Sequence, residues 1–182
     1  MKRIFITYGT SEGQSAKIAN FIADVLRERG HDVTVLDVKE AGNRIPGGCD
    51  GVIVGSSVHV GKHDSHVVDF VRKNKDVLSR MPSAFFSVSL AAHGDLAEAG
   101  QYIQQFEDES AWQPGKVALF GGALAYTQYG FIKRHLMKRI AGSKPGNLGT
   151  DMSRDYVYTE WDGVKRFAED FAAVFPEAGQ LP

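Results

Sequence analysis

The chain has 182 residues, of which 43% are hydrophobic and 24% are charged, and its formal net charge at pH 7 is −1. This length and hydrophobic content are typical of one globular domain over 1–182, and the near-neutral charge argues against a nucleic-acid-binding protein. The single cysteine excludes an intramolecular disulfide framework and a multi-cysteine metal site, so we expect no metal.

Short apolar runs alternate with amphipathic segments along the chain. The first strand is expected at 2–7, and a helix follows at 14–29, where apolar residues recur at helical spacing and Gly30 suits the C-terminal cap. The same patterns predict further strands at 32–37, 51–55, 83–88 and 116–120, and further helices at 63–75, 96–110 and 159–174. Thr159 and Asp162 resemble a capping box at the start of the last helix.

This alternation predicts an α/β fold in which helices cover both faces of a parallel sheet. Five strands favour the flavodoxin-like, doubly wound arrangement in the order 2-1-3-4-5, with ligands bound where the carboxyl ends of the strands meet the reversal of strand order. We therefore expect the site in three loops, at 7–15, 56–63 and 89–94. We find no internal repeat and no second domain.

The first loop is a tight turn between a buried strand and a helix, and it carries the hydroxyl groups of Thr10, Ser11 and Ser15. Free backbone N–H groups and the positive end of the helix dipole would converge there, which suits a phosphate group bound without a lysine. Neither a Walker A ending nor a G-x-G-x-x-G pattern is present. The plainer alternative is an ordinary helix start capped by Ser11 or Ser15.

In a fold of this type, the second and third loops would hold a flat ring, such as an isoalloxazine, and here they offer small, apolar and imidazole groups. His59 should lie at the ring edge and is the candidate general base. The alternative for His59, His63 and His93 is a solvated loop histidine, and this interpretation is favoured for His93. The expected cofactor contacts are Thr10, Ser11, Glu12, Gly13, Gln14, Ser15, Ser56, Ser57, Val58, His59, Val60, Gly61, Ser89, Leu90 and Ala91.

A long insertion, 125–154, separates the fifth strand from the last helix, where ~2–6 residues usually suffice. It carries six Lys/Arg residues against one Asp, a net charge of +5, while the remainder of the chain has a net charge of −6. Helical spacing over 131–141 predicts an apolar face and a basic face. The apolar face is Ile132, Leu136, Met137 and Ile140, and the basic face is Arg134, His135, Lys138 and Arg139.

A basic amphipathic helix of this kind is typical of a membrane-surface element or of a lid over an anionic ligand. Packing on its own domain, with a solvated basic face, is the third interpretation. The candidate contacts to substrate or membrane are Lys133, Arg134, Lys138 and Arg139.

The stretch 8–15 resembles the phosphate loop of flavodoxins, with Glu12 in place of the usual hydroxyl residue. A series of motifs over nearly the whole chain is similar to the menaquinone-dependent protoporphyrinogen IX oxidases, which are flavodoxin-like enzymes of haem synthesis. These motifs lie at 12–15, 55–61, 81–88, 112–114, 122–126 and 156–161. The resemblance implies FMN as cofactor, protoporphyrinogen IX as substrate and a quinone as electron acceptor.

Three alternatives stay open: a flavodoxin-type electron carrier, a nucleotide-binding module without activity, and an NAD(P)H-dependent quinone reductase. The basic insertion, with His59, Lys62 and His63, should penalise an anionic reduced flavin less than an acidic carrier does, which favours the enzyme. Because we find no secretory signal and no apolar run of ~20 residues, we expect a cytoplasmic protein, with peripheral contact to the inner face of the cell membrane as one use of 131–141. The oligomeric state is left open.

Overall fold

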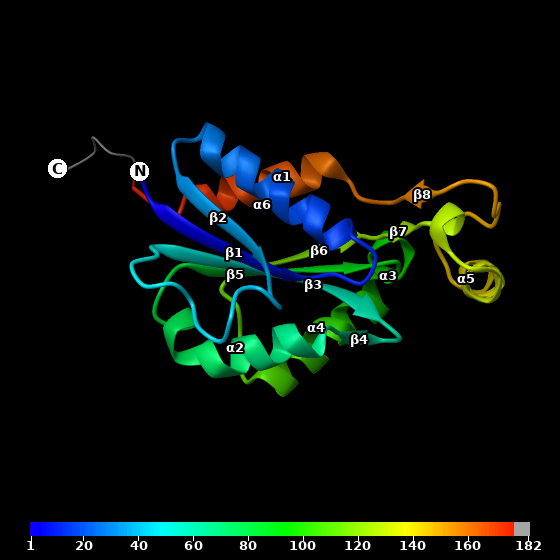
Figure 1. Cartoon of the computed structure of the whole chain (residues 1–182), viewed down its shortest axis with the longest axis horizontal. Coiled ribbons are helices and arrows are strands. Elements are labelled where there is room, and N and C mark those ends of the chain that lie inside the picture. Colours follow the sequence, from blue (N-terminus) through cyan, green and yellow to red (C-terminus); the bar gives the residue numbers. More distant parts are fainter. Residues whose placement is uncertain (177–182) are drawn as a thin grey trace.

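Five parallel strands form the centre of the molecule, in the order β2-β1-β3-β5-β6 (Figure 1). The computed structural model describes residues 1–176. The strands are β1 (Arg3–Gly9), β2 (Asp32–Asp37), β3 (Gly51–His59), β5 (Ser83–Ser89) and β6 (Val117–Gly121). The predicted order 2-1-3-4-5 is therefore confirmed, because the short β4 (Lys62–His63) pairs antiparallel with the end of β3 and adds no parallel strand.

The strands next to the middle of the sheet are buried on both faces, as their continuous apolar runs require. Ile6 of β1 lies opposite Val35 of β2 on one side and Ile53 of β3 on the other. The side chains of Phe5 and Ile6 are fully buried on opposite faces of the sheet. β1 is thus held by its own side chains above and below the sheet and by hydrogen bonds on both edges.

Two helices cover each face of the sheet (Figure 1). Helices α1 (Gln14–Glu28) and α6 (Trp161–Ala172) pack on one face, where Ile18, Ile22 and Phe167 belong to the core. Helices α2 (Ser65–Leu78) and α4 (Leu96–Ser110) pack on the other, together with the single turn α3 (Ala91–Gly94) at the carboxyl edge.

The second predicted loop is wrong, because β3 continues to His59 and then turns back into β4. The turn consists of Val60 and Gly61, both with positive φ (49° and 73°), and two such residues match the right-handed twist of a tight hairpin. The helix expected from position 63 begins at Ser65, and the Asp64 side chain caps it by accepting a hydrogen bond from the His66 N–H.

Gly30, with φ of 82°, lies just after the end of α1 as expected for a C-terminal cap, but the two N-terminal caps considered from the sequence are wrong. Helix α1 has Gly13 at its N-cap, with φ of 91° and no side-chain cap, so neither Ser11 nor Ser15 has that role. The Thr159 hydroxyl donates to the Gly121 carbonyl (2.6 Å) instead of capping the last helix, which begins at Trp161. At α1 a glycine with positive φ occupies the N-cap position, and at α6 the hydroxyl expected to cap the helix bonds to a residue distant in the sequence.

The insertion is a small folded unit beyond the carboxyl edge of the main sheet (Figure 1). It contains a 3-10 turn (Tyr126–Gln128) and α5 (Phe131–Ser143). Two short strands flank it, β7 (Ala123–Leu124) and β8 (Tyr156–Val157), and they pair antiparallel with each other. A separate cluster of buried residues forms its interior, namely Leu124, Tyr126, Tyr129, Ala141 and Leu148. No helix within residues 1–176 is long and apolar enough to cross a membrane.

The predicted faces of α5 need correction. Ala141 is buried and Arg134 and Met137 are half-buried, so the inward face contains a residue expected on the basic side. Ile132 and Leu136, which belong to the predicted apolar face, are 83% and 54% exposed. The spacing identified the helix but not its orientation, because the partner surface is a set of tyrosines contributed by the insertion itself.

His63 is a buried, neutral side chain and not a solvated positive charge near the site. Its ring lies against Phe85 and Phe106, with centroids 5.4 and 5.2 Å away, and its Nε2 is 2.7 Å from the Ser87 hydroxyl. Burial among these rings lowers the pKa of His63 to about 4, because the apolar surroundings disfavour the charged imidazolium.

We predict that His63 makes the folded state lose stability as the pH falls from 6.5 towards 4. In this window the unfolded chain binds a proton that the native histidine excludes, so the free energy of unfolding decreases, by about 3 kcal/mol in total. Urea denaturation of wild type and His63→Gln at several pH values measures this, and the variant should have the shallower slope. His135→Gln controls for the loss of a histidine as such, and equal slopes for wild type and His63→Gln contradict the prediction.

Candidate functional site

A cleft lies at the carboxyl edge of the sheet, where β1 and β3 lead to helices on opposite faces. Together with the solvent space at its open mouth, it encloses about 490 Å³. It is lined by Thr10, Ser11, Glu12, Gln14, Ser15, Ser57, Val58, His59, Val88, Ser89, Leu90, Gly122, Ala123 and Met137.

One end of the cleft has the kind of hydrogen-bond donors that suit an anion. The first N–H groups of a helix have no partner within the helix, and no side chain caps α1. Thr10 shapes the loop by accepting the Gly13 N–H at 2.9 Å. The Ser15 hydroxyl is fully buried and makes no hydrogen bond within the described residues, although buried hydroxyl groups nearly always do. Amide and hydroxyl donors with the positive end of a helix dipole fit a phosphate group.

Gln14 contributes to this end through its main chain. Its side-chain amide donates to Thr159 (2.8 Å), and the Thr159 hydroxyl in turn donates to the Gly121 carbonyl. This buried chain of hydrogen bonds joins the first turn of α1 to the end of β6. It therefore fixes the loop and does not offer a free amide to a ligand.

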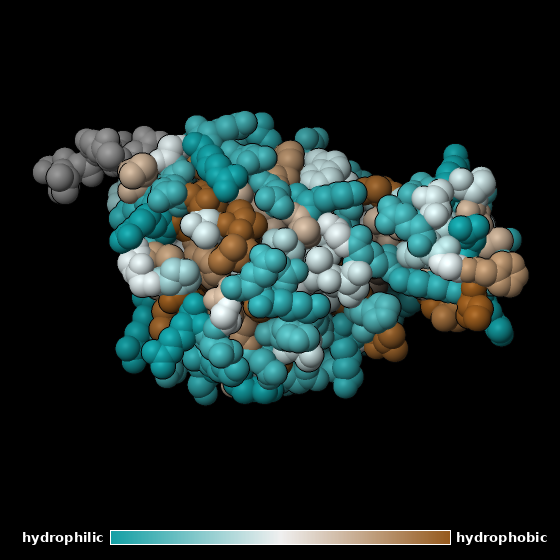
Figure 2. Space-filling view, in the orientation of Figure 1, coloured by the Kyte–Doolittle hydropathy of each residue, from teal (hydrophilic) through white to brown (hydrophobic). Residues whose placement is uncertain are grey.

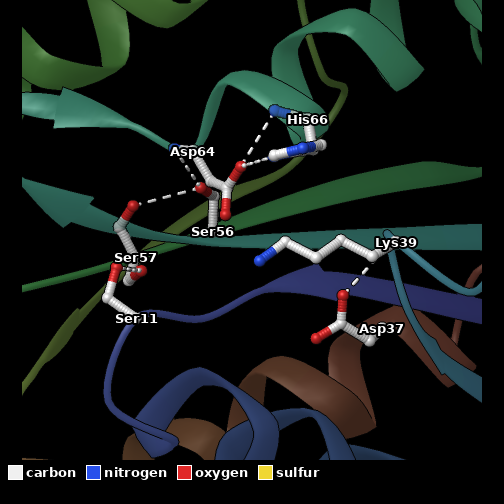
Figure 3. Close-up of polar contacts among 7 residues, drawn as sticks. All are labelled: Ser11, Asp37, Lys39, Ser56, Ser57, Asp64 and His66. Atoms are coloured by element: carbon white, nitrogen blue, oxygen red, sulfur yellow. Dashed lines mark hydrogen bonds and ion pairs between the residues drawn. The ribbon is translucent and has the colours of Figure 1, made fainter.

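Polar contacts fix the end of β3 beside the first loop (Figure 3). The hydroxyl groups of Ser11 and Ser57 lie 3.4 Å apart across the cleft. Ser56 points away from the cleft, where its hydroxyl accepts the Asp64 N–H and donates to the Ser57 carbonyl, both at 3.1 Å. Asp64 also accepts from the N–H and Nδ1 of His66. These bonds hold the backbone at 57–59 against the mouth of the cleft.

The approach of α2 to the first loop requires a glycine at position 9. A Cβ atom on Gly9 would lie 2.6 Å from Cγ2 of Val67 and 2.8 Å from Cβ of Asp64, both closer than side chains pack. Gly9 therefore allows the capping residue of α2 to lie directly beside the turn.

The other end of the cleft suits a flat, mostly apolar group. Val58 and the exposed His59 come from the end of β3, and Ser89 and Leu90 come from the end of β5. Of the fifteen residues expected at the cofactor, ten line the cleft. The other five do not: Gly13, Ser56, Val60, Gly61 and Ala91. Val60 and Gly61 are displaced because they form the hairpin turn, and Ala91 is buried beneath the cleft.

Four further residues line the cleft that the sequence patterns did not indicate, namely Val88, Gly122, Ala123 and Met137. Gly122 and Ala123 follow β6, whose carboxyl end lies at the same edge of the sheet, so the topology gave a signal that they belong to the site. Met137 comes from the insertion, and only the tertiary structure places it there.

The basic residues of the insertion divide into two groups. Lys133 is paired with Glu12 (2.6 Å), and Lys144 is paired with Glu98 (2.6 Å). The Arg134 guanidinium donates to the carbonyls of Tyr126 and Tyr129 at 2.9 and 3.1 Å. Lys133 and Lys144 hold the insertion on its own domain, as the third interpretation proposed, whereas Arg134 joins α5 to the segment just before it within the insertion. Lys138 and Arg139 are exposed on α5.

Within residues 1–176 no group of three or more His, Cys, Asp or Glu side chains is placed to hold a metal ion. The donors of the cleft are amide and hydroxyl groups, with one imidazole at the mouth. This set suits an organic cofactor that carries a phosphate group.

Comparison with known proteins agrees with this geometry. A family model described as a flavodoxin domain matches residues 5–151. A protoporphyrinogen IX dehydrogenase (quinone) of Leishmania major is 34% identical, over 94% of this chain and 75% of its own length. The protein of that name from Escherichia coli K12 is 32% identical, over 93% and 94% of the two chains.

Among solved structures, a flavodoxin of Streptococcus pneumoniae superposes with a TM-score of 0.56 over 95% of this chain and 99% of its own. At 16% identity this likeness shows the shared fold alone. The sequence likeness to the two dehydrogenases is stronger and covers almost all of the present chain. The chain therefore belongs to the flavodoxin-domain family and, within it, to the family of the protoporphyrinogen IX dehydrogenases (quinone).

Proposed function

We propose that this protein binds FMN in the cleft and oxidises protoporphyrinogen IX to protoporphyrin IX, with a quinone as electron acceptor. One observation carries the proposal: an uncapped helix start with an unpartnered buried hydroxyl, Ser15, in a member of this family. Such a donor set without a lysine suits the phosphate of a flavin nucleotide.

The residues divide between the two ends of the cofactor. The first-turn N–H groups of α1, with the hydroxyl groups of Thr10, Ser11 and Ser15, would hold the phosphate. Val58, His59 and Leu90 would contact the ring. When bound, FMN would supply the redox chemistry by taking electrons from the substrate and passing them to the quinone.

The chain itself would position the substrate and move protons. His59 is exposed at the mouth of the cleft, where its imidazole can accept a proton that the porphyrinogen loses on oxidation. Leu90 and Met137 offer apolar walls for a macrocycle. Arg139, exposed on α5, is available to the propionate groups of the substrate.

We also propose that the outer face of α5 contacts the membrane. Phe131, Ile132 and Leu136 are exposed there, and Figure 2 shows hydrophobic residues gathered over this end of the molecule. Lys138 and Arg139 lie on the same exposed surface. Apolar side chains beside cations suit a bilayer with anionic headgroups. Since Met137 of the same helix lines the cleft, contact at the inner face of the cell membrane would bring the cleft close to a lipid-soluble quinone.

The first prediction of this proposal concerns Ser15. Titration of the protein should quench FMN fluorescence, and Ser15→Ala should weaken FMN binding by ~10-fold or more, because a hydrogen bond to a charged phosphate is lost. Riboflavin binding should change little. Ser110→Ala is the matched control, because its hydroxyl is also fully buried and unpartnered but lies outside the cleft. Wild-type protein that leaves FMN fluorescence unchanged refutes the cofactor assignment.

The second prediction concerns turnover. Under anaerobic conditions the FMN-loaded protein should convert protoporphyrinogen IX into fluorescent porphyrin, and a soluble menaquinone analogue should raise the rate. His59→Gln should lower kcat by ~100-fold if the imidazole is the general base. His31→Gln is the control, because His31 precedes β2 at the opposite edge of the sheet and does not line the cleft. A rate no higher than the spontaneous background, together with a low flavin potential, would favour an electron carrier instead.

The third prediction concerns membrane contact. The protein should sediment with phosphatidylglycerol-containing vesicles at low salt, and less so at 0.5 M salt, which screens the attraction. Replacing both Ile132 and Leu136 by Ser should lower the partition constant by ~10-fold or more, because buried apolar area is lost. Val174→Ser changes a residue as exposed as Leu136 (both 54%), but one that follows α6 at the other end of the molecule. Equal sedimentation of all three proteins contradicts the assignment.

A further inference from the structure

The insertion is fastened to the anion-binding loop through one carboxylate. Glu12 accepts a hydrogen bond from the Tyr129 hydroxyl at 2.5 Å and from the Lys133 ammonium group at 2.6 Å. Lys133 also lies over the Tyr129 ring, with Nζ 4.5 Å from the ring centroid. Residues separated by 117 and 121 positions in the sequence thus meet at the first turn of the site.

An acidic residue in this loop would oppose the binding of a phosphate group. The backbone donors and the helix dipole that would attract a phosphate also attract a carboxylate. Left free, Glu12 could turn towards these donors and occupy the anion site, and its charge would repel an incoming phosphate. The loop therefore needs a partner that directs the carboxylate elsewhere and balances its charge.

We propose that Lys133 and Tyr129 are positioning residues that hold Glu12 out of the anion site and neutralise it, so that the insertion determines how strongly the loop prefers a phosphorylated flavin. The inference rests on the proposed FMN binding and deepens it. It assigns α5 a role in cofactor specificity, in addition to any role towards substrate or membrane.

The tyrosine and the helix that carry this contact are firmly held. Tyr129 is buried, and its hydroxyl oxygen accepts the Ala125 N–H at 3.1 Å while its proton is donated to Glu12. Burial, followed by the hydrogen bond to Glu12, raises the pKa of Tyr129, so the phenol stays a donor. Arg134 binds two carbonyl groups just before α5 and fixes the start of the helix from which Lys133 extends.

A second ion pair supplies the matched control. Lys144, just after α5, pairs with Glu98 of α4 at 2.6 Å, and both side chains are 29% exposed. Glu98 does not line the cleft, so Lys144→Met removes a comparable bond between insertion and domain without freeing a carboxylate at the anion site.

The test compares FMN with riboflavin, which has the same ring but no phosphate, by fluorescence titration. Lys133→Met should weaken FMN binding by ~10–100-fold and riboflavin binding by less than ~2-fold, because only the phosphate meets the freed carboxylate. Adding Glu12→Gln should restore FMN affinity to within ~3-fold of wild type, and Lys133→Arg should retain it. Lys144→Met should bind both flavins as wild type does.

Three results overturn the inference. Equal weakening of FMN and riboflavin binding by Lys133→Met would mean that the insertion merely loses its structure. Unchanged FMN affinity in Lys133→Met, or no recovery on adding Glu12→Gln, would mean that the carboxylate does not affect the phosphate. These outcomes leave the proposed function standing as long as wild type binds FMN, whereas a wild type that binds neither flavin overturns both. Glu12→Gln alone, which keeps Lys133 and Tyr129, should bind FMN at least as well as wild type.

Discussion

The position of β1 between two parallel neighbours is the constraint on which the site depends. β2 and β3 pair with it on either side, so the turn at its carboxyl end lies where the strand order reverses. Because α1 follows without a side-chain cap, the first-turn donors stay available at that point. Gly9 allows the start of α2 to lie against the same turn. Burial of β1 thus fixes the position of the helix start that lines this end of the cleft.

The insertion changes what such a cleft can do. It has its own buried cluster of tyrosines and leucines, so it is a folded unit and not a loose loop. Its inward face supplies Met137 to the cleft and, through Lys133, a charge for Glu12, while its outward face leaves Ile132 and Leu136 exposed. One face of the helix therefore lies towards the cleft while the other is exposed to its surroundings.

Most of the fold could be predicted from the sequence because it follows from local patterns. The strand at 32–37 and the helix at 96–110 have the predicted boundaries, and the strand order is that of the doubly wound arrangement which five alternating strands favour. The errors lie where a distant partner decides. Thr159 bonds to Gly121 and not to its own helix, and His63 is buried by the rings of two other elements.

The sequence by itself determined the parallel sheet, the three chain segments near the site and the existence of a basic amphipathic helix, because hydrophobic periodicity and turn residues act over a few positions. The tertiary structure alone decided which face of α5 packs, that Lys133 and Arg134 are engaged while Arg139 is exposed, and that Glu12 is bound by the insertion. The bonds to Glu12 join groups more than a hundred residues apart in the sequence. The buried face of α5 depends on which surface the helix packs against. Neither can be predicted from a pattern of neighbouring residues.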